Sequence, residues 1–268
     1  MYRKTCSIHD FRTGQEVEDV FVLTQARQAA SRNGPYWDLR LQDATGEIEG
    51  KIWSPLSSEY TDLRAEQVVR VRAQVRTFRE QQQLVISDLT RLEESDVDWS
   101  DLLPSSDPPP QDLLQELQGL CRKELAHPGW KKLCREVLGD KSTRQRLLVA
   151  PAAKAIHHAY RGGLLEHTLN VAKTCLAICD QRPDLDREIL FVGAVVHDLG
   201  KAWELECGVA PEYTDSGRLL GHIILGLQVL EPLMSRIEEL DSQLLLHLRH
   251  LILSHHGEFE YGSPKRPK

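Results

Sequence analysis

Apolar and polar residues alternate with a period of two along residues 16–94, which is the pattern of half-buried β-strands. The alternation falls into five short runs, with a turn at residues 43–46 before the third run and another near Arg79 before the fifth. Residues 57–64, between the third and fourth runs, have a helical pattern instead. The pattern therefore predicts five strands with one helix between the third and the fourth.

From residue 111 onward the hydrophobic period is helical, and no run has a period of two. The predicted helices cover residues 112–126, 129–138, 142–149, 164–180, 186–197, 221–234 and 244–256. Between the two halves, residues 96–110 contain three consecutive prolines and four acidic side chains but no basic one. Because successive prolines favour extended backbone, this segment is predicted to be a semi-rigid linker.

The order of the elements predicts the fold class. Five strands with a helix between the third and the fourth is the order of an OB-fold barrel. We therefore expect a multidomain protein with an N-terminal all-β OB-fold barrel (residues 1–95), a linker (residues 96–110) and an all-α domain (residues 111–268).

Composition narrows the class of protein. The 268 residues suffice for two domains with separate cores. The longest apolar run, residues 189–196, is far shorter than the roughly 20 residues of a membrane helix, and the N-terminus lacks the apolar core of a secretion signal. The six cysteines are scattered and form no CxxC pair, which indicates reduced thiols rather than a disulfide framework or a zinc ribbon. We expect a soluble cytoplasmic protein without membrane contact.

The strand half carries side chains suited to a single nucleic-acid strand. Cations alternate with apolar residues on the fourth strand and recur on strands expected to be its neighbours; they are Arg70, Arg72, Arg76, Arg40 and Lys51. The aromatic candidates are Tyr36, Trp37, Trp53 and Phe78. Phosphates could follow the cations while bases stack on the rings. The alternative interpretation of each residue, a solvated strand face with both tryptophans in the core, remains open. The net charge of −7 does not oppose nucleic-acid binding, because the linker holds more than half of the acidic excess.

The helical half carries the candidate chemistry. The apolar helix predicted over residues 186–197 ends in His197 and Asp198, followed by Leu199, Gly200 and Lys201. An imidazole nitrogen and a carboxylate oxygen that turn toward one point suit a divalent metal. We expect Gly200 to let the backbone leave the helix and Lys201 to meet an anion beside the metal.

Ten of the eleven histidines fall between residues 127 and 256. His167, His222 and the pair His255-His256 lie near ends of apolar helices, so one bundle core could gather them around Asp198. This donor set suits manganese, iron, cobalt, nickel or zinc better than calcium or magnesium. A carboxylate that bridges two ions would give a two-metal site for attack on phosphorus. The isolated histidines are interpreted as packing residues; they are His127, His157, His247 and His250.

His167 together with His197-Asp198-Leu-Gly-Lys201 resembles the HD phosphohydrolase superfamily, which is all-helical and metal-dependent. His222-Ile-Ile-Leu-Gly226 and Ser254-His-His-Gly257 resemble its two-metal branch. An OB domain ahead of such a domain is the architecture of the YhaM-type 3′-5′ exoribonucleases. Residues 151–154, 157–167 and 257–267 are also similar to that family.

The resemblance implies roles for individual residues. The implied metal ligands are His167, His197 and Asp198 for a first ion, and Asp198, His222, His255 and His256 for a second. Asp198 and Lys201 would be catalytic, with Lys201 on the scissile phosphate, while Lys154 and His158 would present cations to the substrate backbone. The implied cofactor is a divalent transition metal, two ions with manganese foremost, and the implied partner is single-stranded RNA, with single-stranded DNA as an alternative.

One departure from the superfamily concerns the first metal site. The superfamily closes that site with a further aspartate on a helix beyond the His-His pair, and residues 257–268 contain no aspartate. We expect the chain to be cut before that helix rather than to be naturally inactive. The chain as given would then bind metal incompletely, because an anionic ligand is missing.

Three functions remain in view. The main hypothesis is a metal-dependent 3′-5′ exonuclease that hydrolyses phosphodiester bonds of single-stranded RNA or DNA. The second is a nucleotide or cyclic-dinucleotide phosphohydrolase of the HD type. The third is a non-catalytic single-strand-binding module with an incomplete metal site. The sequence predicts neither the oligomeric state nor processivity.

Overall fold

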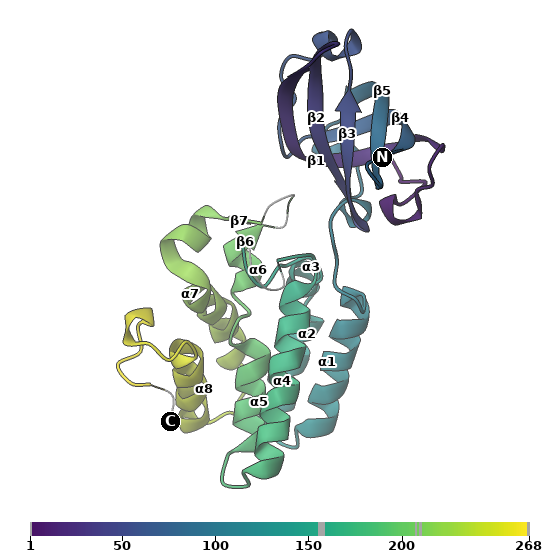
Figure 1. Cartoon of the computed structure of the whole chain (residues 1–268). Coiled ribbons are helices and arrows are strands. Elements are labelled where there is room, and N and C mark those ends of the chain that lie inside the picture. The colour runs from purple at the N-terminus through teal and green to yellow at the C-terminus, as the bar shows by residue number, and fades with distance from the viewer. Residues whose placement is uncertain (1, 155–158, 207, 209–210, 267–268) are drawn as a thin grey trace. The chain divides into compact units, whose positions relative to one another are not determined.

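The computed structural model describes the chain except for residues 1, 155–158, 207, 209–210 and 267–268. It divides into two compact units, Met1–Pro104 and Ser105–Lys268, and each unit has its own hydrophobic core (Figure 1). The division falls inside the predicted linker. Residues 96–101 hydrogen-bond to the first unit, since the backbone N–H of Tyr2 donates to the carbonyl of Asp96 (2.6 Å) and that of Ala44 to the carbonyl of Asp101 (3.1 Å).

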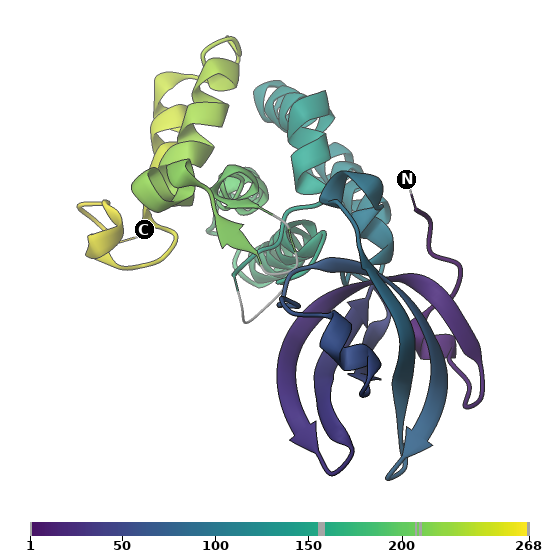
Figure 2. The same ribbon diagram turned by 90° about the horizontal axis from the view of Figure 1, so that it is seen from above.

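The first unit is a closed five-stranded barrel with the strand order β1-β2-β3-β5-β4. Its strands are β1 (Glu16–Ser31), β2 (Gly34–Asp43), β3 (Gly46–Ile52), β4 (Val68–Phe78) and β5 (Gln81–Arg91). Strands β3 and β5 pair in parallel and the other pairs are antiparallel. The predicted OB-fold order is confirmed. Figure 2 shows the long hairpins β1–β2 and β4–β5 on either side of the segment that joins β3 to β4.

The helix predicted over residues 57–64 is mostly wrong. The structure has only a short 3-10 helix, Leu56–Glu59, and the backbone of Tyr60 is extended. Contacts with the barrel hold this residue: its carbonyl accepts from the indole N–H of Trp37 (3.1 Å), and its hydroxyl accepts from the backbone N–H of Leu89 (3.0 Å). Tertiary hydrogen bonds therefore override the local helical pattern.

Strand alternation places the predicted apolar face inside the barrel. Leu41, Ile48 and Ile52 are buried there, as the period of two requires. A Cβ at Gly50, on the same face of β3, would lie 2.4 Å from Cδ1 of Leu41, so only glycine fits. The turn before β3 is held by the buried Asp43, whose Oδ1 accepts from the backbone N–H of Thr45 (2.8 Å).

The second unit is helical, as predicted, apart from a pair of two-residue strands, β6 (Leu205–Glu206) and β7 (Glu212–Tyr213). Its helices are α1 (Pro110–Glu124), α2 (Pro128–Gly139), α3 (Lys141–Leu147), α4 (Gly163–Gln181), α5 (Arg187–Val196), α6 (Lys201–Glu204), α7 (Asp215–Met234) and α8 (Ser242–Ser254). No helix in the described part of the chain is long and apolar enough to cross a membrane.

Helix α5 lies at the centre of this unit. The carboxylate of Asp186 caps its start by accepting from the backbone N–H groups of Glu188 and Ile189. Phe191, Val192 and Val196 are buried on different sides of the helix, because α4 and α8 both pack against it (Figure 1). Because α5 is surrounded in this way, the residues that follow its last turn lie in the interior of the unit.

Candidate metal centre

Asp198 follows the last turn of α5 and is 3% exposed. Its two carboxylate oxygens face different groups of histidines. Oδ2 lies 3.3 Å from Nε2 of His167, on α4, and 3.3 Å from Nε2 of His197. Oδ1 lies 3.5 Å from Nε2 of His222, on α7, and 3.6 Å from Nε2 of His255, just after α8. The carboxylate therefore stands between two sets of imidazole nitrogens.

The sixth predicted ligand, His256, lies in the second set, with its Nε2 3.1 Å from Nε2 of His222. The structure thus brings together all six side chains that the sequence analysis selected as ligands. Within each of two groups, His167–His197–Asp198 and His222–His255–His256, the potential ligand atoms lie within 4.8 Å of one another. Four helices separated in sequence contribute to this cluster.

The residues present fit divalent metal ions. Asp198 Oδ1 and His255 Nε2 are buried without a hydrogen-bond partner among the described residues. Buried polar atoms are normally paired, so two acceptors that face each other with no partner among the described residues fit a cation between them. Imidazole nitrogens with one carboxylate form the donor set of a transition-metal site.

The charge states also suit metal binding. Burial alone would raise the pKa of Asp198, but the imidazoles of His167 and His197 beside its oxygens outweigh burial and hold the pKa of this carboxyl well below its usual range. Burial and the neighbouring His255 lower the pKa of His256 to about 4. At neutral pH the first side chain is therefore an anion and the second an uncharged imidazole, as ligands must be.

Hydrogen bonds on the far side of the rings orient three of the imidazoles. Nδ1 of His197 lies 2.9 Å from the carbonyl of Ala194, and Nδ1 of His255 lies 2.7 Å from the carbonyl of Ile252. A carbonyl can only accept, so each Nδ1 carries the proton and donates it. Each Nε2 then keeps its lone pair on the side of Asp198, which is the usual way that proteins fix the tautomer of a metal-binding histidine.

Glu204 does the same for His222, and the sequence analysis missed it. This glutamate, at the end of α6, is 8% exposed, and its Oε1 lies 3.3 Å from Nδ1 of His222. The same oxygen accepts from the backbone N–H of His222 (2.9 Å). No sequence signal marked Glu204, because its partner lies 18 residues further along the chain and spacing on one helix cannot relate them.

Two glycines set the position of His222. Gly200 does not act as predicted: its φ of −63° and ψ of −19° are right-handed helical values, so it provides no left-handed exit from the helix. Its lack of a side chain matters instead, since a Cβ would lie 1.9 Å from the carbonyl oxygen of His222 and 2.5 Å from the backbone nitrogen of Gly226. Gly221 has a φ of 73°, and this left-handed residue kinks α7 immediately before His222.

The predicted substrate-binding residues of this unit are placed unevenly. Lys201, at the start of α6, has its Nζ 2.9 Å from Asp198 Oδ2 and so faces the first donor group. Lys154 Nζ pairs with Glu212 Oε1 at 2.8 Å and lies 5.9 Å from the ring centroid of Tyr213. His158 falls outside the described residues.

The five cations predicted to lie together on the barrel are separated in the structure. Arg70, Arg72 and Arg76 lie on β4, whereas Arg40 and Lys51 lie on β2 and β3. In the barrel order, β1 separates β4 from β2 and β5 separates it from β3, so the prediction that these cations lie on neighbouring strands is wrong. It failed because strand adjacency in a closed barrel does not follow sequence order.

Each of these five cations has an acidic or amide partner. Glu18 binds both Arg70 and Arg72, and Asp38 binds Lys51. Arg40 Nη1 lies 3.7 Å from Glu47 Oε2, and Arg76 donates from Nε to Gln74 Oε1 (2.9 Å). Surface pairs of this kind contribute only about 0–1 kcal/mol, so a phosphate could displace the carboxylate.

Of the aromatic candidates, Trp37 is in the core and Trp53 is on the surface. Trp53 is 41% exposed and stacks on Tyr36, with ring centroids 4.8 Å apart. Lys51 Nζ lies 5.8 Å from the Tyr36 ring. These three side chains occupy the β2–β3 face, which OB-folds use for oligonucleotides.

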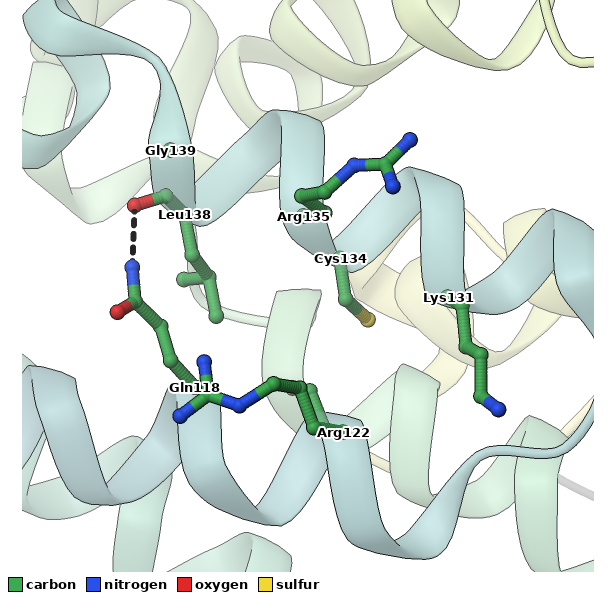
Figure 3. Close-up of a pocket in the computed structure, with 8 residues that line it drawn as sticks. Gln118, Arg122, Lys131, Cys134, Arg135, Leu138 and Gly139 are labelled. Atoms are coloured by element: carbon green, nitrogen blue, oxygen red, sulfur yellow. Dashed lines mark hydrogen bonds between the residues drawn. The ribbon is translucent and has the colours of Figure 1, made fainter.

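A cavity of about 410 Å³ lies between α1 and α2 (Figure 3). Its lining residues are Gln118, Cys121, Arg122, Lys131, Cys134, Arg135, Leu138 and Gly139. The Gln118 amide donates to the carbonyl of Leu138 (3.0 Å) at its edge. Among its described lining residues, the potential metal ligands are two cysteines, and they do not form one of the groups of three or more potential ligands found in the described part of the chain.

Comparison with known proteins covers both units. Residues 164–267 match the HD domain family, and residues 22–92 match the OB-fold nucleic acid binding domain. Residues 112–185 also match a family described as a putative helicase. Among solved structures, the second OB-fold domain of replication protein A from Methanococcus maripaludis is 16% identical, covers 33% of this chain and 95% of that chain, and has a TM-score of 0.29.

Two relatives match almost from end to end. The 3′-5′ exoribonuclease YhaM of Bacillus velezensis is 33% identical over 256 residues, which are 95% of this chain and 80% of the relative. The 3′-5′ exoribonuclease YhaM of Bacillus subtilis is 32% identical over the same shares. The HD match includes all six clustered donors, and the OB-fold match includes most of the barrel. The chain therefore belongs to the family of the YhaM 3′-5′ exoribonucleases.

Proposed function

We propose that the chain is a metal-dependent 3′-5′ exonuclease that hydrolyses phosphodiester bonds of single-stranded RNA, with single-stranded DNA as a second substrate. The observation that carries the proposal is the cluster of six donors around the buried carboxylate of Asp198, in a chain whose relatives are exoribonucleases.

The metal ligands of the proposal are the two groups of the cluster. His167, His197 and Asp198 would hold one ion, and Asp198 with His222, His255 and His256 a second. Ions bound in such a pair lower the pKa of water and offset the charge on a phosphoryl group. We propose manganese, with iron, cobalt, nickel or zinc as the alternatives that metal analysis of the purified protein would distinguish.

The chain's own residues position the scissile phosphate. The Lys201 ammonium, 19% exposed and aimed at Asp198, is placed to pair with a non-bridging oxygen of that phosphate. The water oxygen forms a bond to phosphorus, and the bond from phosphorus to the upstream 3′ oxygen breaks. The products are a nucleoside 5′-monophosphate and a strand shortened by one nucleotide, whose 3′ oxygen takes up a proton.

The barrel supplies affinity for the strand. Trp53 and Tyr36 offer stacking surface, and Lys51 offers charge on the same β2–β3 face. The location we propose is the cytoplasm, because the described cysteines are free, as is usual in a reducing compartment.

Replacement of Asp198 by alanine tests the proposal. We expect Asp198→Ala to lower the rate of degradation of a 3′-labelled single strand at least about a thousandfold, because the variant lacks the carboxylate shared by both donor groups. Binding of the strand, measured by fluorescence anisotropy, should stay within about twofold because the barrel is unchanged.

The matched control is Glu116→Ala, which removes an exposed carboxylate of α1 from the same unit and should leave both measurements unchanged. Full degradation by Asp198→Ala would refute the proposal. Turnover of mononucleotides or cyclic dinucleotides in place of the strand would show a phosphohydrolase of another specificity.

A further inference from the structure

Two cavities adjoin the metal centre, and both are lined by Lys201 and His256. The first, of about 480 Å³, lies among α4, α5 and α8 and includes His167, His197 and Asp198; we call it the α4–α8 cavity. The second, of about 530 Å³, lies between residues 152–154, α6, β7 and α7 and includes His222; we call it the α6–α7 cavity. A phosphate beside Lys201 would therefore stand where the two cavities meet.

The walls of the α4–α8 cavity are apolar outside the metal centre. They are formed by Val171 and Cys175 of α4, Leu190 and Ala194 of α5, and Leu251 of α8. Among the described residues of its lining, Lys201, at the junction, is the only lysine or arginine. A volume of this size accommodates a nucleoside, and apolar walls with charge at one end suit a base and ribose that carry a single phosphate.

The α6–α7 cavity differs in having a second lysine and an aromatic ring in its lining, beside apolar residues and the carboxylate of Glu204. Lys154, which lines this cavity but not the α4–α8 cavity, is the second cation and lies beside the 41% exposed ring of Tyr213. Leu220 and Ile224, on either side of the kink at Gly221, are also exposed. The Lys154–Glu212 pair lies on the surface and is weak, so a phosphate can replace the carboxylate. Cations interleaved with an exposed ring are the features of a surface that follows a single strand.

We propose that the α4–α8 cavity receives the 3′-terminal nucleotide and that the α6–α7 cavity holds the strand upstream, with a base on Tyr213 and a phosphate on Lys154. The distribution of charge sets this direction. A terminal nucleotide has no phosphate beyond the scissile one, so its pocket needs no cation past Lys201. The upstream strand carries a phosphate at each nucleotide and needs another cation. The assignment rests on the proposed exonuclease function.

Three substrates separate the two subsites. Bis(p-nitrophenyl) phosphate carries no nucleoside and reports the metal centre alone. The p-nitrophenyl ester of thymidine 5′-monophosphate adds a nucleoside on the terminal side, and a single-stranded oligonucleotide occupies both sides. Absence of hydrolysis of all three by the unaltered protein would defeat the proposed function, whereas the variants below test only the direction.

On the upstream side, Tyr213→Ala and Lys154→Ala should each raise KM for the oligonucleotide about tenfold, the usual loss for one stacked base or one phosphate contact. Both should leave hydrolysis of the thymidine ester unchanged. The matched control is Lys131→Ala, which removes a lysine from the α1–α2 cavity (Figure 3) and should change none of the three substrates.

On the terminal side, Cys175→Phe fills the α4–α8 cavity with a ring. We expect it to reduce hydrolysis of the oligonucleotide and of the thymidine ester at least tenfold while sparing bis(p-nitrophenyl) phosphate. It should also abolish binding of thymidine 5′-monophosphate, followed by ligand-observed NMR. If Cys175→Phe impairs all three substrates, Val171→Phe, one turn away on α4, repeats the test.

The direction is overturned if both filling variants spare the thymidine ester, or if Tyr213→Ala and Lys154→Ala impair it as much as they impair the oligonucleotide.

Discussion

Asp198 is a single residue that serves two groups of donors. Its burial would favour the neutral acid, yet the surrounding imidazoles keep the pKa of the carboxyl low, so the side chain is an anion at neutral pH. The orphaned Oδ1 faces the orphaned Nε2 of His255. Those unpaired atoms show, at the scale of one side chain, why the cluster is better suited to cations than to packing.

Glu204 offers a test at this scale. Glu204→Gln keeps the shape of the side chain but removes the charge that holds the Nδ1 proton of His222. We expect metal affinity, measured by isothermal titration calorimetry, to fall about 10–100-fold, as for other residues that orient a ligand. Glu206→Gln, an exposed neighbour on β6, is the control; an equal loss in both variants would contradict the role given to Glu204.

The clustering of the histidines could be predicted from sequence because each sits in a short motif beside an apolar helix. Glu204 and Tyr213 could not. Glu204 acts through its contact with His222, which α7 brings back beside α6. Tyr213 belongs to a two-residue strand, which is too short to show a periodicity. Local patterns identify side chains that need a particular chemistry, but they do not identify the partners that the fold brings to them.

At the scale of elements, the decisive contact is the one between the start of α6 and the middle of α7. Gly200 admits the carbonyl of His222, and the kink at Gly221 turns the next residue toward Asp198. The pattern predicted the helix that begins at residue 221, but not its continuation back to Asp215. A kink within a helix leaves the hydrophobic period of each half intact, so the period does not reveal it.

Gly200→Ala should displace α7, because the added Cβ would overlap the carbonyl oxygen of His222. Nearby backbone cannot yield easily, so we expect a loss of roughly 2–4 kcal/mol in the free energy of unfolding, measured by urea denaturation. The same variant should bind metal more weakly. Gly139→Ala, where a Cβ would meet nothing within 4 Å, should leave stability unchanged or raise it by up to about 1 kcal/mol. A neutral Gly200→Ala would refute the account.

At the scale of the whole molecule, two units with separate cores share one chain. The order of an OB-fold barrel and a helical domain was predictable, since a period of two gives way to a helical period once. The boundary between the units was not predictable. The prolines and acidic residues of the segment indicate a linker, but Val97, Leu102 and Leu103 within it are buried. Only the tertiary structure shows that part of the expected linker belongs to the first unit.

Separate cores predict two unfolding transitions, of which metal affects one. Manganese at about 100 times its dissociation constant should stabilise the helical unit by about 2.7 kcal/mol and raise its Tm, while the barrel transition stays fixed. The shift should shrink as the pH falls toward about 4, the pKa of His256, because a protonated imidazole has no lone pair for a metal. Differential scanning calorimetry with and without manganese measures both effects. Equal shifts of both transitions, or none in either, would contradict a metal centre confined to the helical unit.

The packing of Gly200 against α7 has a consequence for how the sequence can vary. Backbone meets backbone there, and a Cβ on Gly226 would also lie only 3.2 Å from the nitrogen of Gly200. No side chain adjusts this distance, so changes in size among the surrounding apolar residues can accumulate without moving His222. Substitution of either glycine, in contrast, has no compensating neighbour. A distant descendant of this protein can therefore lose most of its visible similarity and still inherit the geometry of the second donor group, provided that these two positions persist.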